Sequence, residues 1–93
     1  LGMTTVINAE GDLVGVFTDG DLRRTLDRSV DIHNTPIAEA MTRNGRVIHD
    51  DQLAAEALNM MEELKINALP VINRDGKLTG AINMHDLLRA GVI

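Results

Sequence analysis

The chain has 93 residues, a formal net charge of −5 and a hydrophobic fraction of 44%, and Phe17 is its single aromatic residue. This length suits one compact domain with an aliphatic core, whereas the acidic charge excludes the basic surface that nucleic-acid binding needs. The lack of cysteine excludes a disulfide scaffold, and no apolar run has the length of a membrane span or signal peptide. We therefore expect a cytoplasmic protein without nucleic-acid or membrane partners. Because the chain starts at Leu1 without a methionine, we also expect it to be part of a longer protein.

A β-hairpin is predicted at the start of the chain. Residues 4–8 and 13–17 are short runs rich in β-branched and apolar side chains, which is typical of strands. The turn between them contains Gly11, which can adopt the positive φ that such a turn requires. A short helix is predicted next, because Thr18 or Asp19 can cap it and Leu22 and Leu26 lie four residues apart. We expect this helix to end near Arg28.

A linker and a second, longer helix are predicted in the middle of the chain. Residues 29–45 are polar and connect two halves, with a single helical turn expected at 37–41, and residues 47–48 resemble a brief strand. Asp50 or Asp51 can cap the following helix. Its apolar residues recur at spacings of three and four, and we interpret this stripe as core packing; it consists of Leu53, Ala57, Met60, Met61 and Leu64.

The last part of the chain repeats the first. Residues 6–24 align with residues 71–89 at an offset of 65, and nine of the nineteen aligned pairs are identical. A second hairpin is accordingly expected at 69–73 and 78–82, with a second short helix at 84–90. Tandem duplication of this kind often builds a pseudo-twofold unit with a ligand at its seam. The alternative is duplication for stability alone.

The order of these elements resembles a pair of CBS domains, which are regulatory sensors of adenosyl ligands. The resemblance rests on the sequence LPVI at 69–72 and on the Gly-x-x-Thr-x-x-Asp pattern at 15–21. It implies an α/β fold of two modules, β-β-α and β-α-β-β-α, related by pseudo-twofold symmetry, with the first module truncated at its amino end. The implied organisation is a first module at 1–28, a linker at 29–45 and a second module at 46–93.

Three blocks more narrowly resemble the carboxy-terminal part of bacterial arabinose-5-phosphate isomerases: FTDGDLRR at 17–24, AMTRNG at 40–45 and NMHDLLRAGVI at 83–93. This resemblance implies a regulatory module of an isomerase that feeds Kdo and lipopolysaccharide or capsule synthesis. The catalytic residues would lie in an amino-terminal sugar isomerase domain, so this fragment itself would be no enzyme and would require no cofactor. AMP or CMP-Kdo would be the regulatory ligand.

The residues around the first repeated aspartate support ligand binding independently of the resemblance. Gly15 leaves room near the expected cleft, and Thr18 offers a hydroxyl. A helix that begins near Asp19 directs free N–H groups and a partial positive charge to the same place, which favours a phosphate. Asp21 can accept hydrogen bonds from a ribose diol. The alternative is that Thr18 and Asp21 merely cap the helix.

The resemblance also implies that each cleft takes one wall from either module. The first cleft would be completed by residues from the second module, namely Arg46, Val47, Ile66, Asn67 and Ala68. The base of the nucleotide would lie against Val47, Ile66 and Ala68. A second and weaker cleft would be lined by Gly2, Met3, Asn83, His85 and Asp86, where Asn83 replaces the threonine of the first copy.

Other chemistry has little support in the sequence. Asp19 and Asp21 have the spacing of the first ligands of a calcium loop, but the twelfth position is Val30 where a glutamate is required. The three histidines lack the spacing of a helical zinc pair. Three functions remain open: a nucleotide sensor, a structural module that builds oligomers, and a small enzyme using the acidic residues with His85. Because a truncated first module would leave apolar surface uncovered, we expect a homodimer.

Overall fold

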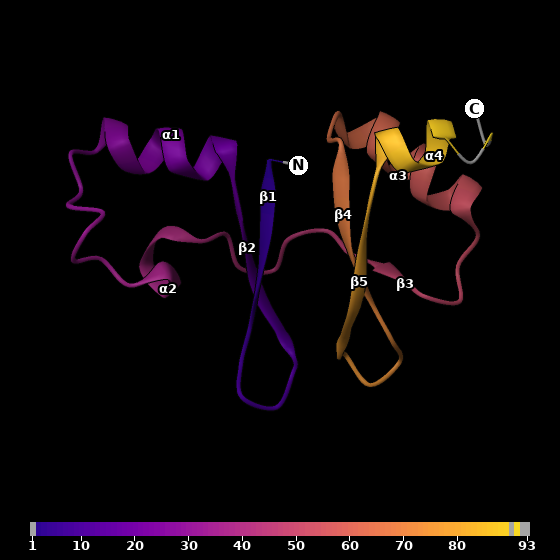
Figure 1. Cartoon of the computed structure of the whole chain (residues 1–93), viewed down its shortest axis with the longest axis horizontal. Coiled ribbons are helices and arrows are strands. Elements are labelled where there is room, and N and C mark those ends of the chain that lie inside the picture. The colour runs from indigo at the N-terminus through magenta and orange to yellow at the C-terminus, as the bar shows by residue number, and fades with distance from the viewer. Residues whose placement is uncertain (1, 90, 92–93) are drawn as a thin grey trace.

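The computed structural model describes residues 2–89 and 91 and shows two halves that lie side by side (Figure 1). The first half contains strands β1 (Met3–Ile7) and β2 (Leu13–Thr18) and helix α1 (Asp19–Asp27). A connection with the single helical turn α2 (Ile37–Ala40) leads to the second half. That half contains β3 (Ile48–His49), α3 (Ala54–Leu64), β4 (Ala68–Ile72), β5 (Leu78–Asn83) and α4 (Met84–Arg89).

Each half is built on one antiparallel hairpin. Strands β1 and β2 form a two-stranded sheet, and β4 pairs with β5 in a three-stranded sheet of order β3-β4-β5, in which β3 is parallel to β4. The predicted strands and helices are present with boundaries that differ by a few residues at most. Ala90, the predicted end of the last helix, lies outside the described residues.

The internal repeat extends to individual hydrogen bonds. Asn8 Oδ1 accepts from the N–H groups of Glu10 and Asp12, each at 3.0 Å, and Asn73 Oδ1 accepts from those of Asp75 and Lys77 at the same distance. The predicted positive φ is found at Gly11 (+85°) and at its equivalent Gly76 (+82°). Both hairpins also shift register at equivalent positions. The two turns are therefore built by the same Asx-type bonding.

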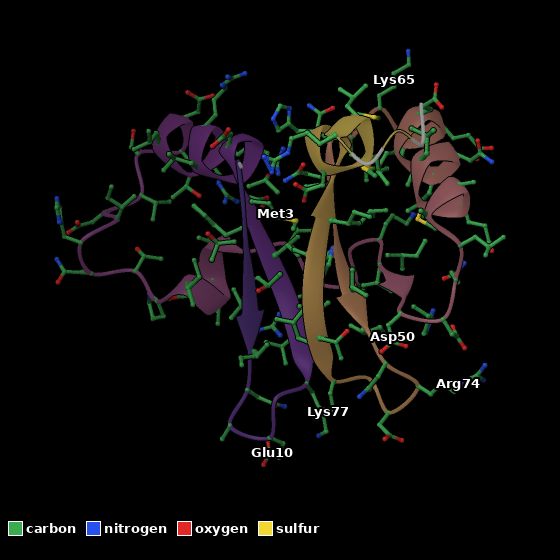
Figure 2. All side chains as sticks on the ribbon, turned by 45° about the vertical axis from the view of Figure 1, so that its right-hand side comes forward. Met3, Glu10, Asp50, Lys65, Arg74 and Lys77 are labelled. Carbon is green, nitrogen blue, oxygen red and sulfur yellow. The ribbon has the colours of Figure 1, made fainter. Side chains whose placement is uncertain are left out.

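The two hairpin turns contact each other across the pseudo-twofold axis. The N–H of Leu13 donates to the Gly76 carbonyl (3.4 Å), and the N–H of Leu78 donates to the Gly11 carbonyl (3.1 Å). Beside them Lys77 forms an ion pair with Asp12 at 2.8 Å, at the end of the molecule where Figure 2 labels Lys77. This ion pair holds the pKa of Asp12 below its ordinary value. The pairing fixes the two sheets relative to each other at this end.

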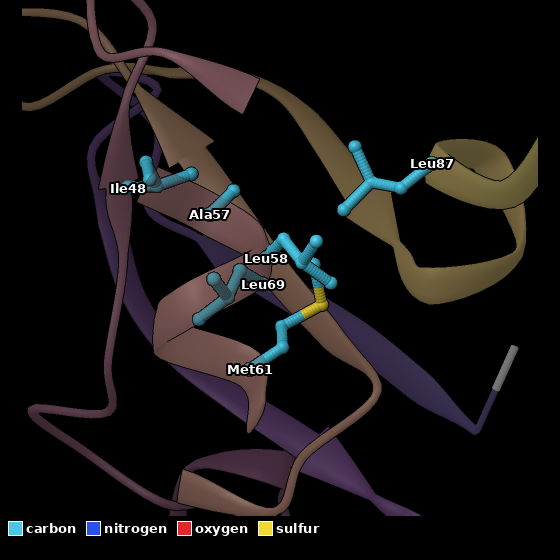
Figure 3. Packing of buried hydrophobic residues seen from close by; sticks show 6 residues of the cluster. All are labelled: Ile48, Ala57, Leu58, Met61, Leu69 and Leu87. Atoms are coloured by element: carbon cyan, nitrogen blue, oxygen red, sulfur yellow. The ribbon is translucent and has the colours of Figure 1, made fainter. Parts of the chain in front are cut away.

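The buried hydrophobic cluster lies in the second half. Its members come from β3, α3, β4 and α4 and are Ile48, Ala57, Leu58, Met61, Leu69 and Leu87 (Figure 3). The stripe predicted for α3 is correct at Ala57 and Met61, and Met60 packs against the cluster. It is wrong at Leu53 and Leu64, which are 68% and 37% exposed. Leu58, which the predicted stripe omits, is buried instead.

The start of α3 also differs from the prediction. Neither Asp50 nor Asp51 caps it; the helix begins at Ala54, and the Glu56 carboxylate accepts a hydrogen bond from the Leu53 N–H at 3.2 Å. Asp51 instead forms an ion pair with Arg74 of the hairpin turn. The side chain at the third helical position thus accepts the N-cap N–H, whereas a capping aspartate would have accepted an N–H of the first helical turn.

The two halves differ in how their equivalent helices are covered. Leu87 of α4 is 3% exposed because it packs against α3, whereas its repeat equivalent Leu22 of α1 is 38% exposed. No counterpart of α3 lies over α1 among the described residues. The buried side chains of α1 are polar instead: Asp21 and Thr25. None of the helices in residues 2–89 has the length and apolar character needed to cross a bilayer.

Candidate functional site

A cavity of about 550 Å³ lies between the two halves, near the start of α1. Its walls come from β1, β2 and α1 on one side and from the end of α3 and β4 on the other, with the linker between them. The lining residues are Gly2, Met3, Val16, Thr18, Asp19, Gly20, Asp21, Thr42, Arg46, Lys65, Ile66, Asn67, Ala68 and Pro70. This volume suits a small organic ligand.

The wall contributed by α1 is a capping box. Thr18 Oγ1 accepts from the Asp21 N–H at 3.2 Å, and the Asp21 Oδ2 accepts from the Thr18 N–H at 2.9 Å. Thr18 is the N-cap residue, so the two residues satisfy each other's backbone donors where β2 turns into the helix. Capping and lining the cavity are therefore compatible roles for this pair.

The Asp21 carboxylate accepts four hydrogen bonds. Besides the Thr18 N–H, its Oδ2 accepts from Thr18 Oγ1 at 3.0 Å, while its Oδ1 accepts from Thr42 Oγ1 at 2.6 Å and from the Arg24 guanidinium. Asp21 is 4% exposed. Burial opposes ionisation of the carboxyl, but the bonds from Thr42, Thr18 and Arg24 outweigh it and hold the pKa of Asp21 below its ordinary value. The carboxylate is thus charged and its acceptor positions are occupied.

Thr42 belongs to the linker and is a site residue that the sequence analysis missed. Its backbone is fixed on β2, because Val16 N donates to the Thr42 carbonyl (2.9 Å) and Thr42 N donates to the Val16 carbonyl (2.8 Å). The spacing of 21 residues between Thr42 and Asp21 carries no periodic signal, and Thr42 lies outside the repeated segments. Nothing in the sequence therefore connects these two side chains.

Gly15 serves this linker and not the cavity, which corrects the prediction that its missing side chain leaves room for a ligand. Gly15 is buried and is not among the residues that line the cavity. A β-carbon added at Gly15 would lie 2.5 Å from Met41 Sδ and 3.0 Å from the Thr42 carbonyl oxygen. Its repeat equivalent Gly80 is exposed and has no such neighbour within 4 Å.

We expect Gly15→Ala to lower the free energy of unfolding by about 1 to 3 kcal/mol, because the Thr42 carbonyl is fixed by Val16 and cannot move aside freely. The matched variant Gly80→Ala adds its methyl group to open space and should stay within about 0.5 kcal/mol of the parent. Urea unfolding of the two variants measures both values. Equal effects at both glycines would contradict the role assigned to Gly15.

The start of α1 offers fewer free donors than the sequence suggests. The Asp19 N–H donates to the Gly2 carbonyl (3.1 Å), and the Asp21 N–H donates to Thr18. Gly20 lines the cavity, and within residues 2–89 no partner is found for its N–H. The positive side chains at the cavity are Arg46 and Lys65, both of the second half. An anionic group in the cavity would thus meet the Gly20 N–H, with the exposed cations Arg46 and Lys65 on its rim.

The second predicted cleft corresponds to a smaller cavity of about 340 Å³. Met3, Asn83 and Asp86 line it, together with residues of β1, β4 and β5. Asn83 Oδ1 accepts from the Asp86 N–H at 2.8 Å, as Thr18 does in the first half. The Asp86 side chain is exposed, and among the described residues no hydrogen bond to its carboxylate is found. The two repeated aspartates thus have different surroundings.

The structure brings most of the predicted site residues together. Seven of the eight predicted for the first cleft line the larger cavity, and Val47 does not. Of the five predicted for the second cleft, Gly2 lines the larger cavity, Met3 lines both, and His85 lines neither of the two. Figure 2 shows Met3 at the seam between the hairpins. In residues 2–89 and 91, no group of three metal-ligating side chains is placed to hold a metal ion.

Comparison with known proteins gives a family and a fold. A model of the CBS domain matches residues 37–93. Arabinose 5-phosphate isomerase KdsD of Pseudomonas aeruginosa is 54% identical over all 93 residues, which span 28% of that protein. CBSX2 in complex with AMP is 30% identical and superposes with a TM-score of 0.80 over 99% of this chain and 72% of the other.

The CBS domain pair of protein MJ0100, in complex with 5′-methylthioadenosine and S-adenosyl-L-methionine, is 24% identical and covers 98% of this chain and 73% of its own. Its TM-score of 0.81 shows that the fold is shared. This fold and the two related hairpin-helix halves confirm the predicted α/β class of a CBS-domain pair. The chain belongs to the CBS domain family.

Proposed function

We propose that the cavity between the two halves binds a nucleotide and that the module thereby regulates an arabinose-5-phosphate isomerase domain in the same polypeptide. The observation that carries the proposal is a 550 Å³ cavity with a buried, charged aspartate on one wall and an apolar strand on the other. Two likenesses support it: the 54% identity to an arabinose 5-phosphate isomerase and the fold shared with a protein that holds AMP.

In this proposal each part of the nucleotide meets a different wall. The Asp21 carboxylate accepts from a ribose hydroxyl that takes the place of one of its present donors, because a charged acceptor is a good partner for a neutral donor. The base lies against the apolar residues of the second half, Ile66, Ala68 and Pro70. The phosphate meets the Gly20 N–H and the positive charges of Arg46 and Lys65, which offset the acidic Asp19.

The ligand proposed is AMP or the CMP part of CMP-Kdo. Both carry the ribose diol and the phosphate that the cavity accommodates. CMP-Kdo is the activated end product of the pathway in which the arabinose-5-phosphate isomerases act, and an early enzyme is a useful point for feedback. On this proposal the isomerase, whose product feeds Kdo and lipopolysaccharide synthesis, lies in another domain, and no residue of this module is catalytic.

Calorimetry with AMP, CMP and CMP-Kdo tests the proposed function. We expect saturable heat with at least one of them at millimolar concentration or below, accompanied by a rise in the melting temperature, because a ligand that binds the folded state stabilises it. Adenosine and cytidine without phosphate serve as controls and should bind more weakly. Heat from none of the three nucleotides would overturn the proposal.

A structural role in a homodimer is the second candidate. The observation that favours it is the apolar surface of the first half and its linker, where the exposed residues are Ile7, Leu22, Leu26, Ile32 and Ile37. Leu22, Ile32 and Ile37 lie around one shallow cavity, and clustered exposed apolar residues are typical of interaction surfaces. A clean monomer in sedimentation at tens of micromolar would count against this role. Protein interfaces that bury about 1,200 to 2,000 Å² should remain associated at roughly that concentration. Ligand binding and dimerisation are separable by these two measurements.

A further inference from the structure

The Asp21 carboxylate has no acceptor position left for a ligand in this structure. A carboxylate provides about four lone-pair sites, and Asp21 uses them for the Thr18 N–H, the Thr18 hydroxyl, the Thr42 hydroxyl and the Arg24 guanidinium. Its 4% exposure leaves little room for further donors. A ligand hydroxyl can therefore bind Asp21 only if one of these donors leaves.

Three of the four donors are poorly suited to leave. Two of them come from Thr18: its N–H closes the capping box, and its hydroxyl is held beside Asp21 because the same oxygen accepts the Asp21 N–H. Arg24 forms an ion pair with Asp21, so its hydrogen bond is the only one of the four in which donor and acceptor are both charged. The Thr42 hydroxyl is uncharged, comes from a different segment and belongs to an exposed residue, so it can exchange Asp21 for water when a ligand hydroxyl takes its place.

We infer that Thr42 is a latch on the ligand site: its hydroxyl occupies the position on Asp21 Oδ1 that a ligand hydroxyl must take, so that it lowers ligand affinity and sets the threshold for sensing. This inference rests on the proposed function. The Thr42 backbone stays paired with Val16 in both states, so that rotation of the side chain suffices to open the latch. Thr42 is thus a residue that sets ligand affinity by acting through Asp21.

The second half supports this reading by contrast. The repeat equivalent of Asp21 is Asp86, whose exposed carboxylate lacks any such bond among the described residues. The linker packs over Gly15, whereas its repeat equivalent Gly80 has no such neighbour within 4 Å of an added β-carbon. The latch is therefore a feature of the linker and of the first half, and the capping geometry alone does not create it.

The test compares Thr42→Val, which removes the hydroxyl but keeps the shape, with Thr42→Ser, which keeps the hydroxyl. A hydrogen bond to a charged group contributes about 1.5 to 3 kcal/mol net, so AMP or CMP-Kdo should bind Thr42→Val about tenfold or more tightly by calorimetry. Thr42→Ser should bind like the parent. Thr35→Val, which removes a linker hydroxyl bound to the Asp31 carbonyl at 2.7 Å, controls for a general effect on the linker.

Each outcome of this test is informative. Tighter binding by Thr42→Val alone supports the latch. Weaker binding by Thr42→Val would show that the hydroxyl contacts the ligand and would overturn the latch while leaving the proposed function intact. Unchanged binding, or equal tightening by Thr35→Val, would also overturn the latch alone. If neither the parent nor Thr42→Val binds any of the nucleotides, the proposed function fails and the latch fails with it.

Discussion

Replacing Leu69 with alanine is expected to lower the free energy of unfolding by about 2 to 5 kcal/mol, because it leaves a cavity in the centre of the buried cluster. Leu69 is 0% exposed and belongs to the same cluster as Ile48, Met61 and Leu87 (Figure 3). Side chains alternate along a strand, so β4 directs Leu69 to the core while its neighbours Ala68 and Pro70 line the larger cavity. Urea unfolding at an unchanged m-value measures the loss.

The matched control for this core variant is Leu53→Ala. Leu53 carries the same side chain but is 68% exposed, so its replacement should change stability by no more than about 0.5 kcal/mol. Similar losses for the two variants would show that the second-half cluster does not provide the main core. The test is of interest because the first half has no comparable apolar cluster among the described residues, and its stability should depend on that of the second half.

The repeat in the sequence predicted most of the fold. The repeated Gly11 and Gly76 both adopt a positive φ in the hairpin turns, and the repeated Asn8 and Asn73 accept the same hydrogen bonds there. The strands and helices follow from local patterns, which repeat at an offset of 65 residues. Such features depend on neighbours in the sequence, and the sequence contains that information directly.

Features that depend on tertiary contacts were predicted less well. The apolar spacing of α3 included Leu53, because periodicity identifies a helix face but not the point at which the chain leaves the core. Asp51 was a reasonable cap by residue type, yet it pairs with Arg74 from a turn 23 positions away. A capping residue contributes about 1 kcal/mol, and this local preference is readily overridden by the ion pair with Arg74. The Glu56 carboxylate, which accepts the Leu53 N–H, replaces the cap at the start of the helix.

In the candidate site, too, the features set by local sequence were predicted and those set by tertiary contacts were missed. Thr18 and Asp21 were predicted from their spacing, and the opposite wall at Ile66 and Ala68 from the resemblance. Thr42 was missed, because it reaches Asp21 through the packing of the linker on β2. That packing also explains why the two copies of one motif differ: the linker covers Gly15 but leaves Gly80 open. Duplication of the sequence thus produced two clefts with unequal polar partners.

Unequal clefts predict unequal responses to mutation of the repeated aspartates. Asp21→Ala should weaken binding of AMP or CMP-Kdo by about tenfold or more, because a hydrogen bond to a charged group contributes about 1.5 to 3 kcal/mol. Asp86→Ala should have a smaller effect, since Asp86 lines the smaller cavity of about 340 Å³ and is absent from the larger one. Calorimetry on both variants with the same nucleotide measures the ratio.

The Asp21 variant needs a control for folding, because Asp21 also closes the capping box of α1. Its removal leaves the Thr18 N–H and hydroxyl without their partner, which is expected to lower the free energy of unfolding by about 1 to 3 kcal/mol. Asp21→Asn retains the shape and one acceptor oxygen, so it should fold better and still bind weakly, because the charge is lost. If Asp86→Ala weakens binding as much as Asp21→Ala in proteins shown to be folded, the ligand does not occupy the larger cavity alone, and the assignment of the site to Asp21 is wrong.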